Sequence, residues 1–350
     1  MVLSGHLKLR HRPMQPEDIG ECVRIVADHP VIGPRYGSTI GQLAGAWQRV
    51  LGSGANTATV FHAGEDERAP ICLFGFSVMV RDDFVREMKK LPLFWAGPEL
   101  TTRVIMGDSP LLKDKELREA NSQDGMNLLV WEGCARPGYE AQPEVGRFMM
   151  AAFIEVHQGY RWKEIISSQA ESPDRLRHIL NTGGFLWDPI AGCYMAGVDK
   201  TLDEIVSMPH IVGITCELER KREGNWGGSW VGSLFDYHAP VLGFSSSEQR
   251  LLSSALSGAT DDQLAGTLGT SLATVKKMWV SIYNRVEDRL PALIPDRLPA
   301  DASTGSRGKE KRRRLLAYLR EHFEELRPVS RRLLRRTSSN IRSQIAETGQ

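Results

Sequence analysis

The chain has few cysteines and lacks any hydrophobic run long enough to cross a membrane. Its five cysteines among 350 residues are scattered and never form a Cys-x-x-Cys pair, which argues against a disulfide framework and a zinc site. No apolar stretch approaches the roughly 20 residues of a membrane helix, and the opening MVLSGHLKLRHRPM lacks the apolar core of a secretory signal. These absences predict a cytoplasmic protein with no membrane partner, no metal and no cofactor.

Charge is unevenly distributed along a chain whose composition is otherwise ordinary for a globular protein. Residues 305–350 hold thirteen Lys and Arg against five Asp and Glu, a balance of +8. Because the whole chain carries +1, residues 1–304 carry −7. An acidic body with a basic tail indicates a polyanionic partner. The arginines of the tail include Arg331, Arg332, Arg335 and Arg336.

Residues 1–218 alternate between strand-like and helix-like segments, which predicts an α/β domain with a mixed sheet and flanking helices. Short runs of apolar and β-branched residues predict strands at 7–10, 57–62, 71–80, 126–134, 162–168, 193–198 and 211–218. Apolar periodicity and capping residues predict helices at 16–26, 39–51, 143–157 and 173–181. The Gly and Pro residues of 32–38 predict a break, and 82–125 is expected to be irregular with some helix.

The pattern stops at Glu219, and the sequence predicts a linker over 219–243. An all-α helix-turn-helix is predicted at 244–294. The remainder, 295–350, is expected to hold a second linker, a charged helix at 309–326 and the basic tail.

The segment 244–290 predicts three short helices, each with its own capping residue. Ser245 with Glu248 forms a capping box before the first helix, Thr260 precedes the second, and Ser271 precedes the third. Four apolar residues recur along the third helix at helical spacing, which predicts a buried stripe. They are Val275, Trp279, Ile282 and Val286.

The opposite face of the third helix carries small, hydroxyl and cationic side chains. A recognition helix needs such residues in its N-terminal half, which enters the major groove. We therefore predict a DNA-binding set of Ser271, Ala273, Thr274, Lys276, Lys277 and Ser281. From 244 to 290 five acids balance five bases, so the tail or dimerisation would have to supply a positive field.

This segment resembles the LuxR/GerE helix-turn-helix over all three helices. The family's opening L-T-x-x-E corresponds to FSSSE at 244–248, its central stretch to LAGTLGTSLATVK at 264–276, and its ending to IYNRV at 282–286. Met278 and Val280 depart from the pattern, replacing a frequent His and an often polar residue.

The resemblance implies a transcription regulator that binds double-stranded DNA as a homodimer. Lys276 would reach a base edge or a phosphate, and Thr274 and Lys277 would contact the backbone. The alternative from the residues alone is a packing module whose two lysines are solvated and which contacts only proteins.

The order of elements before residue 219 is similar to the GNAT acyltransferase fold. The local matches are the strand EIIS at 164–167 with GGF at 183–185, and RHRP at 10–13 with Glu17 and Asp18. That resemblance implies an acyl-CoA-dependent N-acyltransferase. The matching phosphate-binding place, 136–147, has the wrong glycine spacing together with Pro143 and two acids, so we predict that acyl-CoA binding is lost.

Other candidates for chemistry in this domain are single residues. Glu132 could be a general base, although a carboxylate paired with Arg136 is the commoner explanation. We expect solvated or capping roles for His157 and His178. The tryptophans are expected in the core, or around a cleft where they could stack on a ligand; they are Trp131, Trp162 and Trp187.

Three functions remain open from the sequence. The first is a DNA-binding regulator whose N-terminal domain senses a small-molecule effector or mediates dimerisation. The second is an acyltransferase with an appended DNA-binding module. The third is a regulator whose N-terminal domain binds only a protein partner.

Overall fold

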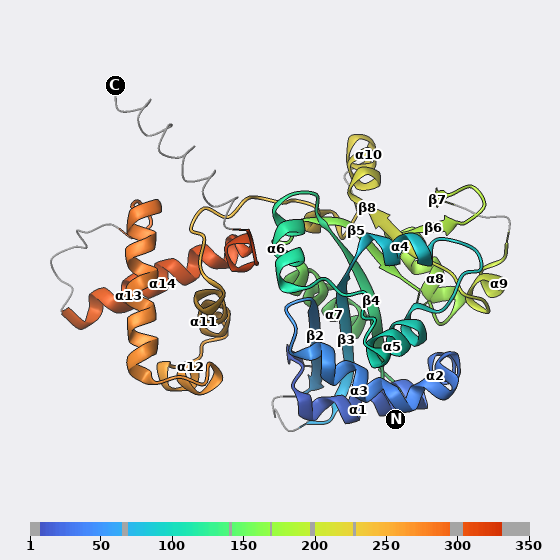
Figure 1. Ribbon diagram of the computed structural model, residues 1–350, viewed down its shortest axis with the longest axis horizontal. Helices are drawn as coiled ribbons and strands as arrows, with labels where there is room; N and C mark the ends of the chain where they lie inside the picture. Colours follow the sequence, from blue (N-terminus) through green and yellow to red (C-terminus); the bar gives the residue numbers. More distant parts are fainter. Residues whose placement is uncertain are drawn as a thin grey trace. The chain divides into compact units, whose positions relative to one another are not determined.

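The computed structural model describes residues 8–64, 69–139, 142–168, 170–196, 200–226, 229–294 and 304–330, with the backbone alone at 222–226 and 304–307. The chain divides into two compact units (Figure 1). Unit 1 comprises residues 1–120, 124–157 and 161–235, and unit 2 comprises residues 121–123, 158–160 and 236–350. The tail arginines named above lie outside the described residues: Arg331, Arg332, Arg335 and Arg336.

In the described ranges, unit 1 is built on a mixed sheet of eight strands, which confirms the predicted α/β class. The strand order is β1-β2-β3-β4-β5-β8-β6-β7, and neighbours are antiparallel except for the parallel pair β4 and β5. The bounds are β1 Leu9–Pro13, β2 Asn56–Ala63, β3 Ile71–Val80, β4 Met126–Ala135, β5 Trp162–Ser167, β6 Phe185–Asp188, β7 Cys193–Met195 and β8 Val212–Thr215.

Helices pack on both faces of this sheet. On one face the buried ring of Trp47 in α3 stacks on Phe76 of β3, with centroids 5.0 Å apart. On the other face Val145 of α7 packs against Leu73 of β3. Alternate side chains of β3 therefore enter two cores. The helices are α1 Ile19–Asp28, α2 Ile32–Tyr36, α3 Ile40–Leu51, α4 Asp82–Met88, α5 Ala96–Met106, α6 Asp114–Ser122, α7 Pro143–His157, α8 Pro173–Asn181, α9 Leu202–Val206 and α10 Cys216–Trp226.

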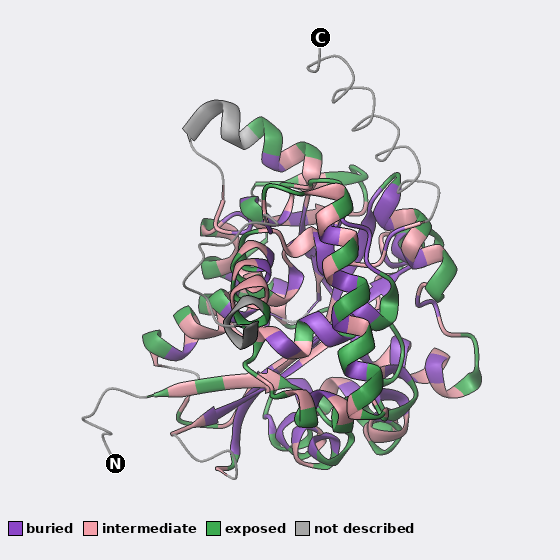
Figure 2. Cartoon of the chain, turned by 90° about the vertical axis from the view of Figure 1, so that its left-hand side faces the viewer, coloured by how far each residue is buried: buried purple, intermediate pink, exposed green. Residues whose placement is uncertain are grey.

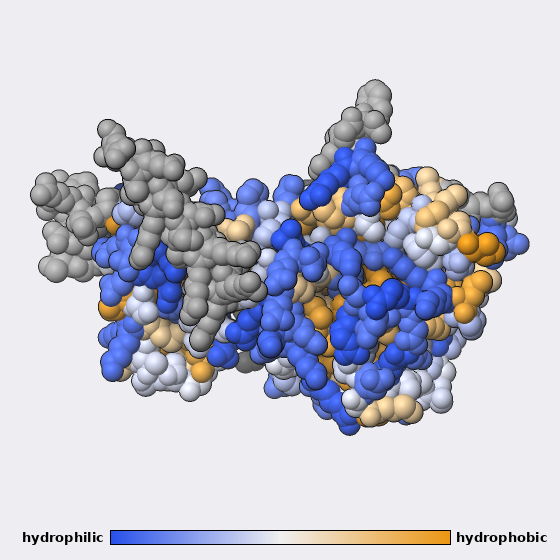
Figure 3. Space-filling model, turned by 45° about the horizontal axis from the view of Figure 1, so that its top comes forward, coloured by the Kyte–Doolittle hydropathy of each residue, from blue (hydrophilic) through white to orange (hydrophobic). Residues whose placement is uncertain are grey.

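The distribution of burial agrees with this layered arrangement. Figure 2 shows buried residues along the strands and on the inner sides of the helices, with exposed residues on the outer sides. The face of unit 1 in Figure 3 is mainly hydrophilic, and hydrophobic residues are visible between the polar ones. No helix in the described ranges is long and apolar enough to span a membrane.

Two sequence predictions in unit 1 were wrong because a local side-chain cap starts a helix where we expected none. The predicted break at 32–38 contains α2, since Nδ1 of His29 accepts hydrogen bonds from the amides of Val31 and Ile32. The predicted linker at 219–243 begins inside α10, because Oγ1 of Thr215 accepts from the amide of Leu218. The sequence analysis also did not predict β6 and α9.

Unit 2 begins with the three predicted helices, α11 (Ser246–Leu256), α12 (Asp261–Thr267) and α13 (Leu272–Arg289). Each starts at its predicted cap, whose hydroxyl accepts a hydrogen bond from the amide three residues later. The predicted stripe of α13 is buried, which confirms the periodicity; it consists of Val275, Trp279, Ile282 and Val286.

Helix α14 (Thr304–Glu321) packs into the same core as those three helices. Its Leu315 and Leu319 are fully buried in one cluster with Trp279. This helix starts at Thr304, five residues before the predicted start of the charged helix, and it shares a core with the helices predicted at 244–294. The two leucines lie one helical turn apart within a very basic segment. The apolar face of this helix is therefore short and is not evident from a sequence dominated by charged residues.

Candidate functional site

The solvent-facing side of α13 is the first candidate site. All six predicted DNA-binding residues are exposed: Ser271, Ala273, Thr274, Lys276, Lys277 and Ser281. Because a helix turns about 100° per residue, Lys277 and Asn284 lie opposite the buried stripe, and Lys276 lies at the edge of the exposed face. Sequence analysis missed Asn284, although its spacing of seven from Lys277 places it on the same line.

Side chains in the C-terminal half of α13 contact neighbouring helices. Oγ of Ser281 donates a hydrogen bond to Oε1 of Glu248 in α11 at 2.9 Å. Glu287, in the last turn of α13, forms an ion pair with Lys311 of α14. The N-terminal half of α13 is therefore the more accessible half, and it carries Lys276 and Lys277.

The beginning of α13 is fixed by a tight turn and a cap. Gly269 adopts φ of +60°, a conformation that a side chain disfavours. Oγ of Ser271 accepts a hydrogen bond from the amide of Thr274 at 3.2 Å and lies 2.9 Å from the hydroxyl of Thr274. Both hydroxyls therefore help to orient the helix.

Acids and bases balance over residues 244–290, but ion pairs inside unit 2 decide which of these charges remain exposed. Within the part of the chain that the structure describes, neither Lys276 nor Lys277 has an ion-pair partner. Positive charge consequently remains on the outward face of α13, while several acids are neutralised elsewhere. Those pairs are Asp261 with Arg312, Glu248 with Arg285, and Glu287 with Lys311.

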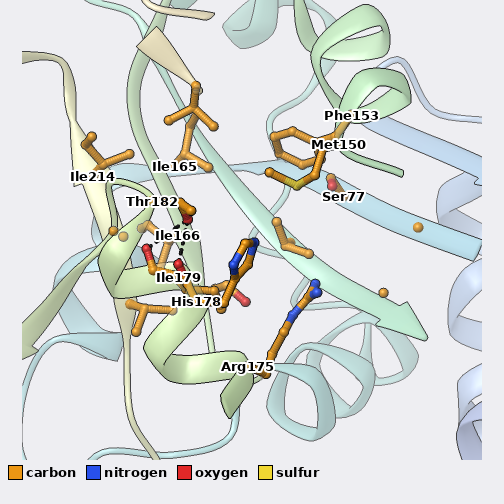
Figure 4. Close-up of a pocket in the computed structure, with 18 of the residues that line it drawn as sticks. Ser77, Met150, Phe153, Ile165, Ile166, Arg175, His178, Ile179, Thr182 and Ile214 are labelled. Atoms are coloured by element: carbon orange, nitrogen blue, oxygen red, sulfur yellow. Dashed lines mark hydrogen bonds between the residues drawn. The ribbon is translucent and has the colours of Figure 1, made fainter. Parts of the chain in front are cut away.

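A cavity of about 190 Å³ in unit 1 is the second candidate site. It lies where the parallel pairing of β4 and β5 ends, at Val130 and Ser167, although β4 continues to Ala135. Figure 4 shows its residues between the sheet and the helices α7 and α8. Its lining is mostly apolar and includes Met149, Met150, Phe153, Ile165, Ile179 and Ile214.

Glycines on two strands provide part of the space. Gly75 of β3 lies directly opposite Gly133 of β4, and both line the cavity. A Cβ atom at Gly75 would meet nothing within 4 Å. Ser77, two residues further on the same side of β3, also lines the cavity and is 4% exposed. The floor is therefore open enough for a side chain or a ligand.

Two basic side chains of α8 reach the cavity. Arg175 and His178 stand one turn apart, and Figure 4 shows both directed from α8 toward the space below Met150 and Phe153. In the described residues no ion pair or side-chain hydrogen bond is formed by Arg175. We predicted His178 as solvated or capping, and its side chain is exposed at this cavity.

Glu132 also lines the cavity, but the pairing that we predicted for it was wrong. Its Oε1 accepts a hydrogen bond from the hydroxyl of Tyr36 at 2.8 Å, and the residue is 2% exposed. Burial, together with the charge of Glu132, raises the pKa of Tyr36 well above its usual value, so the phenol remains a donor. Arg136 instead pairs with Glu21.

The remaining predicted candidates have structural contacts. His157 is buried rather than solvated: its Nε2 lies 2.6 Å from Oγ1 of Thr57, and its Nδ1 lies 2.8 Å from the carbonyl of Phe153. Trp131 and Trp162 are buried in the core, as expected, and Trp187 is partly buried. Among the described residues, no cluster of His, Cys, Asp or Glu could hold a metal ion.

The N-terminus of α7 does not fit the phosphates of an acyl-CoA. Pro143 has no amide hydrogen, and Glu144 places a negative charge in the first turn. The amides of Val145 and Gly146 both donate to the carbonyl of Gln142. Few free donors therefore remain at a place where phosphate binding would need several.

Comparisons with known proteins add little to this description. No protein-family model matches the chain, and no curated protein matches it. A solved structure of an uncharacterized protein (bh2621) from Bacillus halodurans is similar at 12% identity and a TM-score of 0.33, over 63% of this chain and 91% of that chain. A likeness this low supports no conclusion about function.

Proposed function

We propose that the chain is a cytoplasmic transcription regulator that places the N-terminal half of α13 in the major groove of double-stranded DNA. The observation that carries this proposal is the outward face of α13, where Lys276 and Lys277 are exposed beside the small residue Ala273. A helix of this kind fits the major groove, and cations on it attract phosphates. The resemblance of 244–290 to the LuxR/GerE helix-turn-helix supports the same function.

The geometry suggests separate roles for the exposed residues. Lys277 lies at the middle of the outward face, so we assign it the base edge that the sequence resemblance gives to Lys276. Lys276 and Thr274, at the sides of the helix, would contact phosphates, which position a protein on DNA. Val280, 58% exposed on the same face, would contact a thymine methyl group. Ser281 is not included among the proposed DNA contacts, because its hydroxyl donates a hydrogen bond to Glu248.

We further propose that the regulator binds as a homodimer, since two copies would read two half-sites and double the phosphate contacts. Unit 1 would sense an effector, and its cavity is the place we assign to that role. A unit 1 that contacts only a protein partner would leave the cavity without a ligand.

The test of DNA binding is a selection from random duplexes with the full chain. Repeated capture and sequencing should enrich a common motif with two related half-sites. A pool that stays random after several rounds, at low salt as well as at physiological salt, would contradict the proposal.

An acyltransferase is the second candidate, and the buried Glu132 at the cavity is the observation that favours it. A carboxylate in such surroundings can act as a general base. The misfit of the first turn of α7 argues against the acyl-CoA that this activity needs. We therefore rank it below the regulator.

A further inference from the structure

We propose that the cavity of unit 1 binds a monocarboxylic acid with an apolar tail. The carboxylate would lie at Arg175 and His178, and the tail would lie between α7 and the sheet. Binding at this cavity does not depend on the proposed DNA contact of α13, so each can fail without the other.

The lining explains why the tail is apolar. Methionine and phenylalanine side chains of α7 face isoleucines of β5, α8 and β8 across the space. Methionine is flexible and fills irregular gaps against different ligands. Because Gly75 and Gly133 leave the floor of the sheet uncovered, a hydrocarbon chain can replace the contacts that side chains would make there. The hydrophobic effect favours burial of this hydrocarbon chain in the cavity.

The charges explain why the head group is an anion. Arg175 lines the cavity without an ion pair in the described residues, and His178 stands one turn further along α8. Asp174, the nearest acid in sequence, is paired with Arg177. Glu171 also lines the cavity, but within the described ranges no ion pair joins it to Arg175, and its charge acts on Arg35. An arginine presents a planar set of donors that matches a carboxylate.

The carboxylate of Glu132 repels an anion, in contrast to Arg175 and His178. Its position therefore limits where the carboxylate of the ligand can lie. Glu132 accepts the hydroxyl of Tyr36, on the side of the sheet where Trp47 and Phe76 pack. A ligand carboxylate at Glu132 would bring two negative charges together. The head group is therefore placed at α8, and the apolar tail extends toward Gly75 of β3.

The experiment is a calorimetric titration of the full chain with three probes that share one tail: octanoate, octan-1-ol and octylamine. Octanoate should bind about tenfold more tightly than octan-1-ol, because a charged hydrogen bond is added. From hexanoate to octanoate the affinity should rise about fourfold per methylene. Octylamine binding more tightly than octanoate would overturn the proposal and indicate an acid of the lining, Glu171 or Glu132, as the head-group site.

Two variants with matched controls locate the ligand. Arg175→Gln should reduce octanoate binding to the level of octan-1-ol, whereas Arg177→Gln, on the same helix but paired with Asp174, should not. Gly75→Leu should fill the cavity and abolish binding of all three probes. Gly41→Leu, also with open space around its Cβ position, should leave binding intact.

Unchanged octanoate affinity in Arg175→Gln, or no heat of binding in the native chain, would contradict the proposal. If Gly75→Leu does not fold, the comparison of Arg175→Gln with Arg177→Gln still tests whether the carboxylate binds at Arg175. Measuring duplex DNA binding of the same variants separates this result from the proposed function, because only the effector site should change.

Discussion

The guanidinium of Arg312 in α14 donates a hydrogen bond to Oδ1 of Asp261 in α12, over a distance of 2.8 Å. The same guanidinium lies 4.5 Å from the ring centroid of Trp279 in α13. One side chain thus joins three helices, and it neutralises an acid at the start of α12. The charged helix α14 is for this reason part of the unit that presents α13 to solvent.

Because α14 belongs to this core, shortening one of its two buried leucines should destabilise unit 2. Leu315→Ala should lower the free energy of unfolding by about 2–5 kcal/mol, because it removes buried methyl groups and leaves a cavity. Leu316→Ala, at a half-buried position next to it, should cost less. Urea denaturation of both variants, monitored by circular dichroism, measures the difference. Equal losses would mean that α14 does not pack as described.

Unit 2 should lose stability in acid through Glu248. Burial alone would raise the pKa of Glu248, but hydrogen bonds from the amide and hydroxyl of Ser245 and the hydroxyl of Ser281, with the charge of Arg285, lower it below its usual 4.5. Since the pKa is lower in the folded than in the unfolded chain, the ionised carboxylate stabilises the fold above pH 4.5. That contribution is lost as the pH falls through the lowered pKa.

Melting temperatures from about pH 6 to about pH 3 test this dependence. Glu248→Gln should melt at a lower temperature near neutral pH, and its melting temperature should fall less steeply in acid. A variant with the same acid dependence as the native chain would show that other carboxylates dominate.

The basic tail should add affinity for DNA without adding sequence preference. Deleting residues 331–350 should flatten the fall of log K with log salt, by about 0.9 for each phosphate group that the tail neutralises in the full chain. The preferred motif should stay the same, because base contacts specify and phosphate contacts position. If the tail instead covers the acidic body, the salt dependence should stay unchanged and unit 1 should melt at a lower temperature.

Acetyl-CoA should not bind to the full chain at micromolar concentration. The first turn of α7 offers a proline and a glutamate where the phosphates would need free amides. Equilibrium dialysis with labelled acetyl-CoA measures this directly. Saturable binding that Glu144→Lys strengthens would support the acyltransferase instead, because a cation at that turn attracts phosphates only if they bind there.

The elements that the sequence predicts well are those with local signals. Ser245, Thr260 and Ser271 each cap a helix within three residues, and the apolar stripe of α13 repeats every three or four residues. Such patterns need no knowledge of distant parts of the chain. The hydrogen bonds accepted by His29 and Thr215 are equally local, but the surrounding glycines, prolines and charges indicate loops.

Contacts between distant residues could not be predicted in this way. Glu132 meets Tyr36 from 96 positions away, whereas the sequence suggested its near neighbour Arg136. The basic helix α14 shows only two fully buried leucines among its described side chains, so nothing local indicates that it completes unit 2. The cavity likewise depends on Gly75 and Gly133 becoming opposite each other, which is a property of strand register.

The binding of α13 to DNA is tested most directly by anisotropy titrations on the duplex obtained from selection. Lys277→Ala should weaken binding about ten- to a hundredfold and relax the preference at one base pair. Lys276→Ala should weaken binding to all duplexes alike and reduce the salt slope by about one. Arg313→Ala, whose guanidinium is paired with Glu310 in α14, is the control and should bind normally. If a folded variant lacking both Lys276 and Lys277 binds the selected duplex as tightly as the native chain, α13 is not the recognition helix.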